Sequence, residues 1–303
     1  MRTKLVLAAL IALTFTGSFL AKERITRPIE DAISPISASR IVSMAPSVTE
    51  TLYALGFGDR VIGVTRYCTY PPEVAGKPKI GGYHDPNFEA IARLKPDLVV
   101  MLDEHRPLLP AFRKLGLSTA VVNHKTIDGV LDSLPRLGEA CGQLARAVQI
   151  RDEMVRRLDR VRRQTAGLPR PRVMFSIDRI VGTGRLESVY IAGADGFFDT
   201  MIELAGGQNA YRQGLVRFPV VSPEGILRMD PEVIVDMVSG MTASRPGEAA
   251  LRAEWQQLAQ VSAVRNGRVH VVAEPYAFVP GPRFVLLVEK LARLIHPELD
   301  RQP

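Results

Sequence analysis

A phrase that occurs twice in the chain constrains its fold more than any other feature. The first copy, EAIARLKPDLVV, runs from Glu89 to Val100, and the second, EGILRMDPEVIV, runs from Glu224 to Val235. In each copy a glutamate opens a short helical segment, a proline ends it, and an acidic residue and three apolar residues follow. Proline cannot continue a helix, and a short apolar run is typical of a buried strand. The repeat predicts two lobes with one copy each.

The length and composition of the chain agree with two lobes. It has 303 residues, of which 46% are hydrophobic and 23% charged, enough for one large domain or two medium ones. The formal charge is +7, and the longest basic run, residues 154–164, has helical spacing with an apolar stripe. No aromatic residues alternate with these cations, so we expect a solvated helix face and no nucleic-acid partner.

The first residues have the pattern of a cleavable export signal, predicted here over residues 1–21. Arg2 and Lys4 precede an apolar run from Leu5 to Phe15 that is short for a membrane span, and small residues follow it. A short membrane anchor is the alternative. No cysteine follows the apolar run closely, so we do not expect a lipoprotein, and residues 22–39 are predicted to be a flexible lead-in.

The chain has two cysteines, Cys68 and Cys141. Two cysteines cannot form a thiolate metal cluster. Whether they form a disulfide stays open at this point, because the sequence does not give the distance between them.

From Arg40 onward, predicted strands and helices alternate, a pattern typical of mostly parallel sheets covered by helices. We predict an N-terminal α/β lobe over residues 40–141, a linking helix over 142–167 and a C-terminal α/β lobe over 168–303. The fold class is therefore α/β, with two Rossmann-like lobes joined by one long helix. The predicted strands are 40–45, 61–65, 97–102, 118–124, 173–177 and 268–273, and the predicted helices include 46–58, 127–140, 196–207 and 283–295.

Several segments resemble one family of transport proteins. They are RIVSMAPSVTETLYALGFGDRVIGVTRYCTYPPEV from Arg40, KPKIGGYHDPNFEAIARLKPDLVV from Lys77, AGGQNAY from Ala205 and VSPEGILRMDPEVIV from Val221. In this order they are similar to the periplasmic substrate-binding proteins of ABC importers for ferric siderophores, haem and cobalamin. The pattern is nearest to that of the cobalamin-binding members, and the resemblance extends from Arg40 to Pro297.

The resemblance implies a class III periplasmic binding protein without catalytic residues or a covalent cofactor. Its bound cargo would be cobalamin, with a ferric siderophore or haem as alternatives, held in a cleft between the lobes. Its partners would be an ABC permease dimer in the inner membrane and the ATPase of that permease, and the protein would be a periplasmic monomer.

In that family, one glutamate at the tip of each lobe binds arginines of the permease. The matching positions here are Glu89 and Glu224. A carboxylate in the first turn of a helix is favoured by the helix dipole, and it can accept a bidentate arginine. The alternative is that each acid only stabilises its own helix.

The resemblance also assigns ligand contacts to aromatic residues in loops at the carboxyl ends of strands, where open α/β sheets bind ligands. In the first lobe these loops are residues 45–47, 65–72 and 81–87. The assigned residues are Tyr67, Tyr83, Phe218 and Tyr276. Aromatic side chains offer flat area to a corrin, a porphyrin or a chelate, although each could instead be a packing residue.

Two details leave the cargo open. Tyr83 falls where haem-binding relatives place an iron-ligating tyrosine, since a phenolate suits ferric iron. The loop with Tyr276 lacks an arginine where the cobalamin-binding relative has one, and Arg283 lies just beyond it.

Other functions are alternatives. The histidines stand singly in the sequence and form no zinc motif, but His84, His124 and His270 lie near predicted strand ends, so zinc or manganese transport is one alternative. A two-lobed α/β enzyme or a metal-cluster carrier is another. Gly182-Thr183-Gly184 resembles part of a phosphate loop but lacks the rest of a dinucleotide fingerprint.

Overall fold

The computed structural model describes residues 38–194, 196–214, 216–238 and 247–301. The predicted export signal lies outside these residues, as does the predicted lead-in up to residue 37. Among the described residues, no helix has both the length and the apolar character that a membrane span requires.

The first sheet has four strands in the order β2-β1-β3-β4, and all neighbouring strands are parallel. The strands are β1 (Ile41–Ser43), β2 (Val61–Val64), β3 (Leu98–Leu102) and β4 (Thr119–Val122). The helices of this lobe are α2 (Pro46–Ala54), α3 (Phe88–Arg93), α4 (Leu109–Lys114) and α5 (Ile127–Ala140). Fully buried residues from β1, β3, α3 and α4 pack together as its core, as expected for a sheet covered by helices.

The second sheet has the order β10-β9-β5-β6-β8, and β7 pairs with β5. Its strands are β5 (Arg172–Arg179), β6 (Val189–Ile191), β7 (Gln208–Asn209), β8 (Val220–Val221), β9 (Val233–Met237) and β10 (Val269–Val272). Its helices are α7 (Phe197–Leu204), α8 (Pro223–Met229), α9 (Glu248–Glu254), α10 (Ser262–Arg265) and α11 (Phe284–Ile295). The pairs of β5 with β7 and β9, and of β9 with β10, are parallel, whereas β6 pairs antiparallel with β5 and β8.

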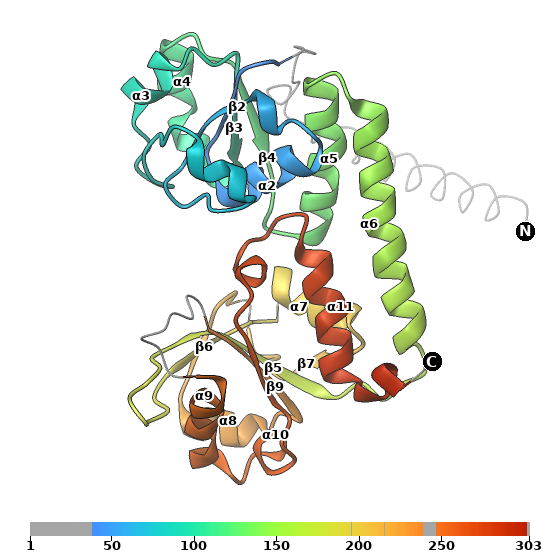
Figure 1. Ribbon diagram of the computed structural model, residues 1–303. Helices are drawn as coiled ribbons and strands as arrows, with labels where there is room; N and C mark the ends of the chain where they lie inside the picture. Colours follow the sequence, from blue (N-terminus) through green and yellow to red (C-terminus); the bar gives the residue numbers. More distant parts are fainter. Residues whose placement is uncertain (1–37, 195, 215, 239–246, 302–303) are drawn as a thin grey trace, which may run out of the picture. The chain divides into compact units, whose positions relative to one another are not determined.

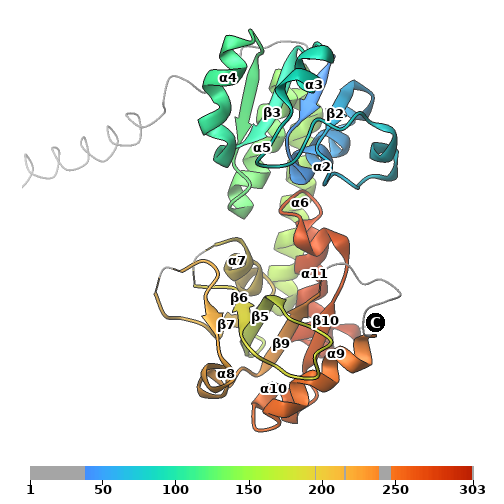
Figure 2. The ribbon, with the colours of Figure 1, turned by 90° about the vertical axis from the view of Figure 1, so that its left-hand side faces the viewer.

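Helix α6 (Leu144–Thr165) joins the two sheets (Figures 1 and 2). It packs against α5 in the first lobe and against α11 and α7 in the second. Its Arg157 binds Glu289 of α11 with both carboxylate oxygens, at 2.6 and 2.8 Å. The fold is therefore the predicted one, two α/β lobes joined by one long helix, while the exact lobe boundaries at residues 141 and 168 stay predictions.

Short 3-10 helices connect the longer elements. They are Gly58–Arg60, Pro72–Gly76, Asp103–Leu108, Trp255–Leu258, Pro275–Phe278 and Pro297–Arg301.

The two copies of the repeated phrase have the same local structure. The first forms α3 and β3 and the second forms α8 and β9, with a buried isoleucine, Ile91 or Ile226, facing the core. The residue before the proline is left-handed in both copies, with φ of 47° at Lys95 and 42° at Asp230. The chain thus turns sharply between helix and strand in each lobe.

An acid after the proline fixes the first copy to the neighbouring strand. The carboxylate of Asp97 accepts the backbone N–H groups of Ser39 and Arg40 at 2.9 to 3.1 Å. The guanidinium of Arg40 in turn donates to the carbonyl of Leu94 at the end of α3. These hydrogen bonds satisfy backbone N–H groups at the start of β1 and a carbonyl at the end of α3. Together they form a clasp that joins the start of β1 to the turn between α3 and β3.

The second copy repeats this clasp. Glu232 accepts the backbone N–H of Arg172 at 2.9 Å, and the guanidinium of Arg172 donates to the carbonyl of Met229 at 2.8 Å. The proline, the acid and the buried isoleucine of the phrase therefore have structural roles in both lobes.

Both cysteines are buried and free in the structure. The sulfur of Cys68 lies 3.2 Å from the hydroxyl of Thr49 and 3.1 Å from that of Thr65. The open question of a disulfide is thus answered in favour of two separate thiols.

Candidate ligand-binding cleft

Two neighbouring cavities of about 350 and 370 Å³ lie between residues of the first lobe and residues of the second. They share four lining residues, so they are parts of one cleft: Glu104, His124, Phe278 and Pro280. Residues 45–47, which follow β1, line the second cavity, while Glu104 and His124 follow β3 and β4. The cleft therefore lies at the carboxyl ends of parallel strands, as the sequence predicts for a ligand site.

Tyr83 lines the cleft and is held in place from three sides. Its hydroxyl donates to Oε1 of Glu104 at 2.6 Å. Its ring lies 4.7 Å from the ring of His84 and 4.6 Å from that of His105, measured between centroids. The backbone N–H of Leu102 donates to Nδ1 of His105, so Nε2 carries the proton and donates to the carbonyl of Tyr83 at 2.9 Å.

These contacts keep the tyrosine protonated. Burial raises the pKa of Tyr83 strongly, and the hydrogen bond to Glu104 and the charge of that carboxylate raise it further. Forming a phenolate would place two negative oxygens next to each other. Tyr83 is therefore a neutral hydroxyl that keeps its proton in the hydrogen bond to Glu104.

The other charged groups of this wall are paired. Lys125 binds Asp103 at 2.8 Å and lies 3.9 Å from Glu104. The hydrogen bonds from Lys125 and Arg106 lower the pKa of Asp103. The charged side chains of this wall are thus joined in a network of ion pairs and hydrogen bonds.

His124 lines both cavities and is buried. Ser133 donates its hydroxyl proton to the carbonyl of Val130, so its oxygen accepts from Nε2 of His124 at 3.0 Å. Nδ1 has no hydrogen-bond partner among the described residues. Burial lowers the pKa of His124 to about 4, so the imidazole is neutral at pH 7.

The wall of the second lobe contains a cluster of aromatic residues. Phe197 and Phe198, the first residues of α7, line the cavity together with Phe218. The ring of Phe198 stacks on buried Phe175 at 5.1 Å and lies 6.5 Å from Phe218, whose side chain is 47% exposed. The exposed ring of Phe218 thus extends an aromatic cluster into the cleft.

Of the two remaining predicted ligand contacts, one lines the cleft and one does not. Tyr67 lines the second cavity and is 55% exposed. Tyr276 lines neither cavity, although Phe278 of the same 3-10 helix lines both. The structure thus brings Tyr67, Tyr83 and Phe218 to one cleft, and the role of all four predicted residues as ligand contacts stays a prediction.

Arg283 connects the two lobes instead of facing the cleft. Its guanidinium binds both carboxylate oxygens of Glu50 on α2, at 2.6 and 2.8 Å. The ring of Tyr70 lies 3.6 Å from the guanidinium carbon, close enough for a cation–π contact. A Cβ at Gly281 would lie 3.3 Å from Glu50, so glycine allows this close approach. Burial raises the pKa of Glu50, and Arg283 opposes that change.

Glu89 and Glu224 are exposed in the first turns of α3 and α8, and neither lines the cleft. Glu89 binds Arg93 of its own helix at 2.5 Å. A hydrogen bond with Ser222 lowers the pKa of Glu224, and Arg228 also contributes. The lowered pKa keeps Glu224 ionised at pH 7, and both carboxylates are accessible.

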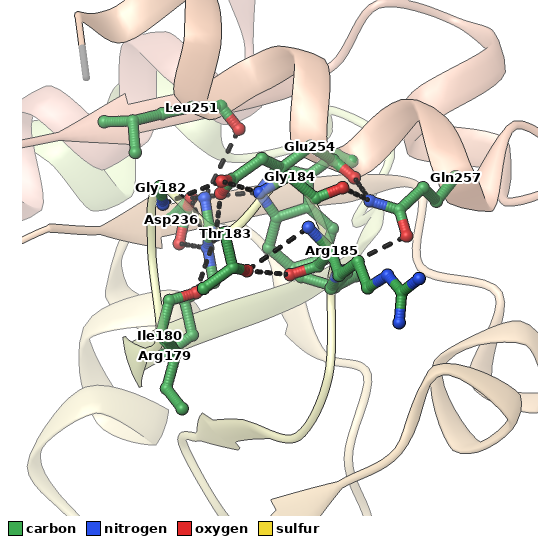
Figure 3. A network of polar contacts seen from close by, with 12 residues as sticks. Arg179, Ile180, Gly182, Thr183, Gly184, Arg185, Asp236, Leu251, Glu254 and Gln257 are labelled. Carbon is green, nitrogen blue, oxygen red and sulfur yellow. Dashed lines mark hydrogen bonds and ion pairs between the residues drawn. The ribbon is translucent and has the colours of Figure 1, made fainter.

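The glycine-rich turn around Thr183 has a structural partner. The backbone N–H of Gly182 and, more weakly, that of Gly184 donate to Oε1 of Glu254, at 2.8 and 3.4 Å. The other oxygen of Glu254 binds buried Arg179, which also binds Asp236 (Figure 3). Since a carboxylate already occupies these N–H groups, the turn does not have the open arrangement of a phosphate loop.

The zinc or manganese alternative rests on three histidines near predicted strand ends. Within the described part of the chain, no group of three or more histidine, cysteine, aspartate or glutamate side chains is placed to hold a metal ion. The structure thus offers no support for a bare metal site.

Residues 41–276 match the family model described as periplasmic binding protein. The chain belongs to this family. It is 29% identical over 288 residues to a vitamin B12-binding protein of Vibrio cholerae serotype O1, with 93% of this chain and 95% of the relative covered.

Solved structures of the family share the fold. The periplasmic vitamin B12 binding protein BtuF of Vibrio cholerae is 25% identical, with a TM-score of 0.72 over 89% of this chain and all of that chain. The periplasmic heme-binding protein RhuT of Roseiflexus sp. RS-1, in its apo form, is also 25% identical, with a TM-score of 0.71 over 86% of this chain and 98% of that chain. Similarity alone therefore does not choose between a corrinoid and a haem.

Several lining residues were not predicted from the sequence. Glu104 and His124 lie two residues after the ends of β3 and β4, so the rule on carboxyl strand ends could have identified them as cleft residues. Phe197 and Phe198 have a weaker signal, a pair of aromatic residues after a glycine.

Proposed function

We propose that this periplasmic binding protein is the substrate-binding component of an ABC importer, and that it captures cobalamin or a related corrinoid in the cleft. Capture, docking and release are its whole cycle, without covalent chemistry or turnover. Export to the periplasm by the segment 1–21, without a lipid anchor, belongs to the same proposal.

One observation carries the choice of cargo. The hydroxyl of Tyr83 donates to Glu104 at 2.6 Å, in a cleft whose opposite wall is aromatic. A flat chelate can stack on such a wall, and a neutral hydroxyl can hydrogen-bond to its amide side groups. Ferric haem would instead require a phenolate beside the carboxylate of Glu104, which that negative charge disfavours.

Calorimetric titration of the purified protein tests this proposal. We expect wild type to bind one cyanocobalamin per chain saturably. Tyr83→Ala should bind it at least about tenfold more weakly, since one good contact is worth about 1.4 kcal/mol. Tyr190→Ala is the matched control, because Tyr190 is exposed and lines neither cavity. Tight binding of ferric haem without binding of cyanocobalamin would overturn the choice of cargo.

We also propose that Glu89 and Glu224 dock the protein to a permease dimer. Both are exposed at equivalent positions of the two lobes, and neither belongs to the clasps that hold the repeated phrase. The clasps explain why the second acid of the phrase recurs, but they do not explain why its first glutamate recurs. A partner that binds both lobes would explain the recurrence of this glutamate.

ATP-driven uptake in vesicles that contain the cognate permease tests docking. Glu89→Ala with Glu224→Ala should reduce uptake at least about tenfold, as expected for the loss of two charge-assisted pairs, at unchanged affinity for the cargo. The control is Glu153→Ala with Glu248→Ala, which removes two exposed glutamates that also bind a nearby arginine on their own helix. Equal uptake by both double variants would contradict the docking role.

A further inference from the structure

Among the described residues that line the cleft, one arginine has no partner within the described part of the chain. Arg217 lines the aromatic part of the cleft, beside Phe218. Its guanidinium makes no hydrogen bond or ion pair with any residue that the structure describes. The other charged residues of the cleft differ from it in this respect.

Each of those other charges has a partner. Glu104 accepts from Tyr83, and Lys125 binds Asp103. Asp199 accepts from the amide of buried Asn209 at 2.9 Å. Among the described residues that line this cleft, Arg217 is therefore the one charged side chain without a hydrogen-bond or ion-pair partner.

The backbone of Arg217 is fixed against the end of β6. Gly193 donates its N–H to the carbonyl of Arg217 at 2.9 Å, and Ile191 donates to the carbonyl of Pro219 at 3.0 Å. The carbonyl of Val216 comes so close that a Cβ on Gly193 would lie 1.8 Å from it. Only glycine allows this close approach of the two backbone segments. The approach fixes the position of the Arg217 backbone, from which its side chain extends.

The side chain of Arg217 also has a defined path. A Cβ on Gly196 would lie 3.5 Å from Cγ and 3.7 Å from Nε of Arg217, so the side chain passes directly over this glycine. Gly196 precedes Phe197 and Phe198 at the start of α7. The guanidinium is thus carried along the aromatic wall on which a flat chelate would stack.

We propose that Arg217 binds an oxyanion on the periphery of the cargo. The side chain of Arg217 is exposed to solvent at the cleft. A guanidinium offers a planar fork of donors that fits a phosphate or a carboxylate with two hydrogen bonds. This inference rests on the proposed function. For a complete corrinoid the oxyanion is the phosphodiester of the nucleotide loop, and for a porphyrin it would be a carboxylate.

Matched ligands separate the two sources. Cyanocobalamin carries the phosphodiester, whereas dicyanocobinamide has the corrin ring without it. Haem carries two carboxylates, which its dimethyl ester lacks. Calorimetric titration of all four ligands with wild type, Arg217→Ala and Arg217→Lys measures the contribution of the oxyanion directly.

We expect Arg217→Ala to bind cyanocobalamin about tenfold more weakly than wild type, equivalent to about 1.4 kcal/mol, and to bind dicyanocobinamide equally well. Arg217→Lys should lie between them, because a lysine keeps the charge without the fork. The loss should shrink in high salt. Arg212→Ala is the charge-matched control from the same segment, and it lies outside the cleft.

Two failures are distinguishable. In the first, wild type binds cyanocobalamin, and Arg217→Ala either loses affinity equally for cyanocobalamin and dicyanocobinamide or loses none. This result would overturn the oxyanion site and leave the proposed function standing. A loss confined to haem relative to its dimethyl ester would assign the oxyanion to a carboxylate and overturn the phosphodiester. Wild type that binds none of the four ligands would overturn the proposed function together with this inference.

Discussion

The two lobes are alike in their framework and different in their cleft walls. In both, a helix, a left-handed turn, a proline and a strand are fixed by an acid that binds the start of a neighbouring strand. Facing the cleft, however, the first lobe presents paired charges around Tyr83. The second presents Phe197, Phe198 and Phe218 with Arg217, which has no partner among the residues that the structure describes.

The difference separates what a lobe needs in order to fold from what the cleft needs in order to bind. The repeated residues hold backbone ends together, which is the same task in each lobe. The residues that line the cleft are not repeated, as expected if the proposed cargo has two unlike faces. Glu89 and Glu224 are repeated without a clasp role, which fits a partner that meets both lobes in the same way.

Acid should have the largest effect on both lobes together. Burial lowers the pKa of His124 in the first lobe and of His270 in the second to about 4 each, with smaller contributions from neighbouring charges. The unfolded chain binds these protons below about pH 6.5 and the folded chain only below about pH 4, so stability falls as the pH drops through this window.

Urea unfolding between pH 7 and 4 measures this loss. His124 alone should account for about 2 to 3 kcal/mol, at about 1.4 kcal/mol per pKa unit, because it is almost fully buried. His124→Gln and His270→Gln should each flatten the pH dependence. Variants as steep as wild type between pH 6.5 and 4 would show that these imidazoles do not titrate as described.

Removing the clasps should have the next largest effect, and an unequal one. Asp97 accepts from two backbone N–H groups and the hydroxyl of Ser39. Glu232 accepts from one backbone N–H and forms a solvent-exposed ion pair with Arg172 at 3.4 Å, and such pairs contribute little. We expect Asp97→Ala to lower the free energy of unfolding by about 2 kcal/mol and Glu232→Ala by about 1 kcal/mol.

Chemical denaturation at pH 7 compares the two variants with Asp85→Ala. Asp85 forms an exposed ion pair with Arg66, whose removal costs little. Equal losses for Asp97→Ala and Asp85→Ala would show that the clasp contributes no more than an ordinary surface pair.

On the cleft side, Phe218→Ala should weaken binding of cyanocobalamin about tenfold, because it removes apolar area on which the ligand stacks. Tyr276→Ala serves as the comparison in the same lobe and should have a smaller effect, since Tyr276 lines neither cavity. A larger loss for Tyr276→Ala in calorimetry would place the ligand outside the cleft described above.

The smallest change should come from Glu104→Gln. Without the carboxylate, the pKa of Tyr83 falls, because its charge and its hydrogen bond both raise that pKa. Ultraviolet titration at alkaline pH detects the shift, while affinity for cyanocobalamin should change less than about threefold, the size of a weak net contact. An unchanged tyrosine titration would mean that Glu104 does not control Tyr83.

The framework was largely predictable because it depends on local patterns. Apolar runs, glycines and prolines predicted most of the strands and helices, and the repeated phrase predicted two lobes. The antiparallel strands β6 and β8 were not predicted, since they have only three and two residues and follow a turn-rich segment.

The site was predictable only in part. Tyr67, Tyr83 and Phe218 reach the cleft from loops that the resemblance indicated. The pairing of Tyr83 with Glu104 and that of Arg283 with Glu50 join residues 21 and 233 positions apart, so no local pattern in the sequence signals them. Arg217 stands out only once the partners of all other cleft charges are known.

A single competition measurement tests the central claim most directly. The protein is mixed with equal amounts of cyanocobalamin and ferric haem, freed of unbound ligand, and examined by visible absorption spectroscopy. We predict that it retains the corrinoid spectrum at one ligand per chain. Retention of haem instead, with the charge-transfer band of a tyrosinate bound to iron, would contradict the account.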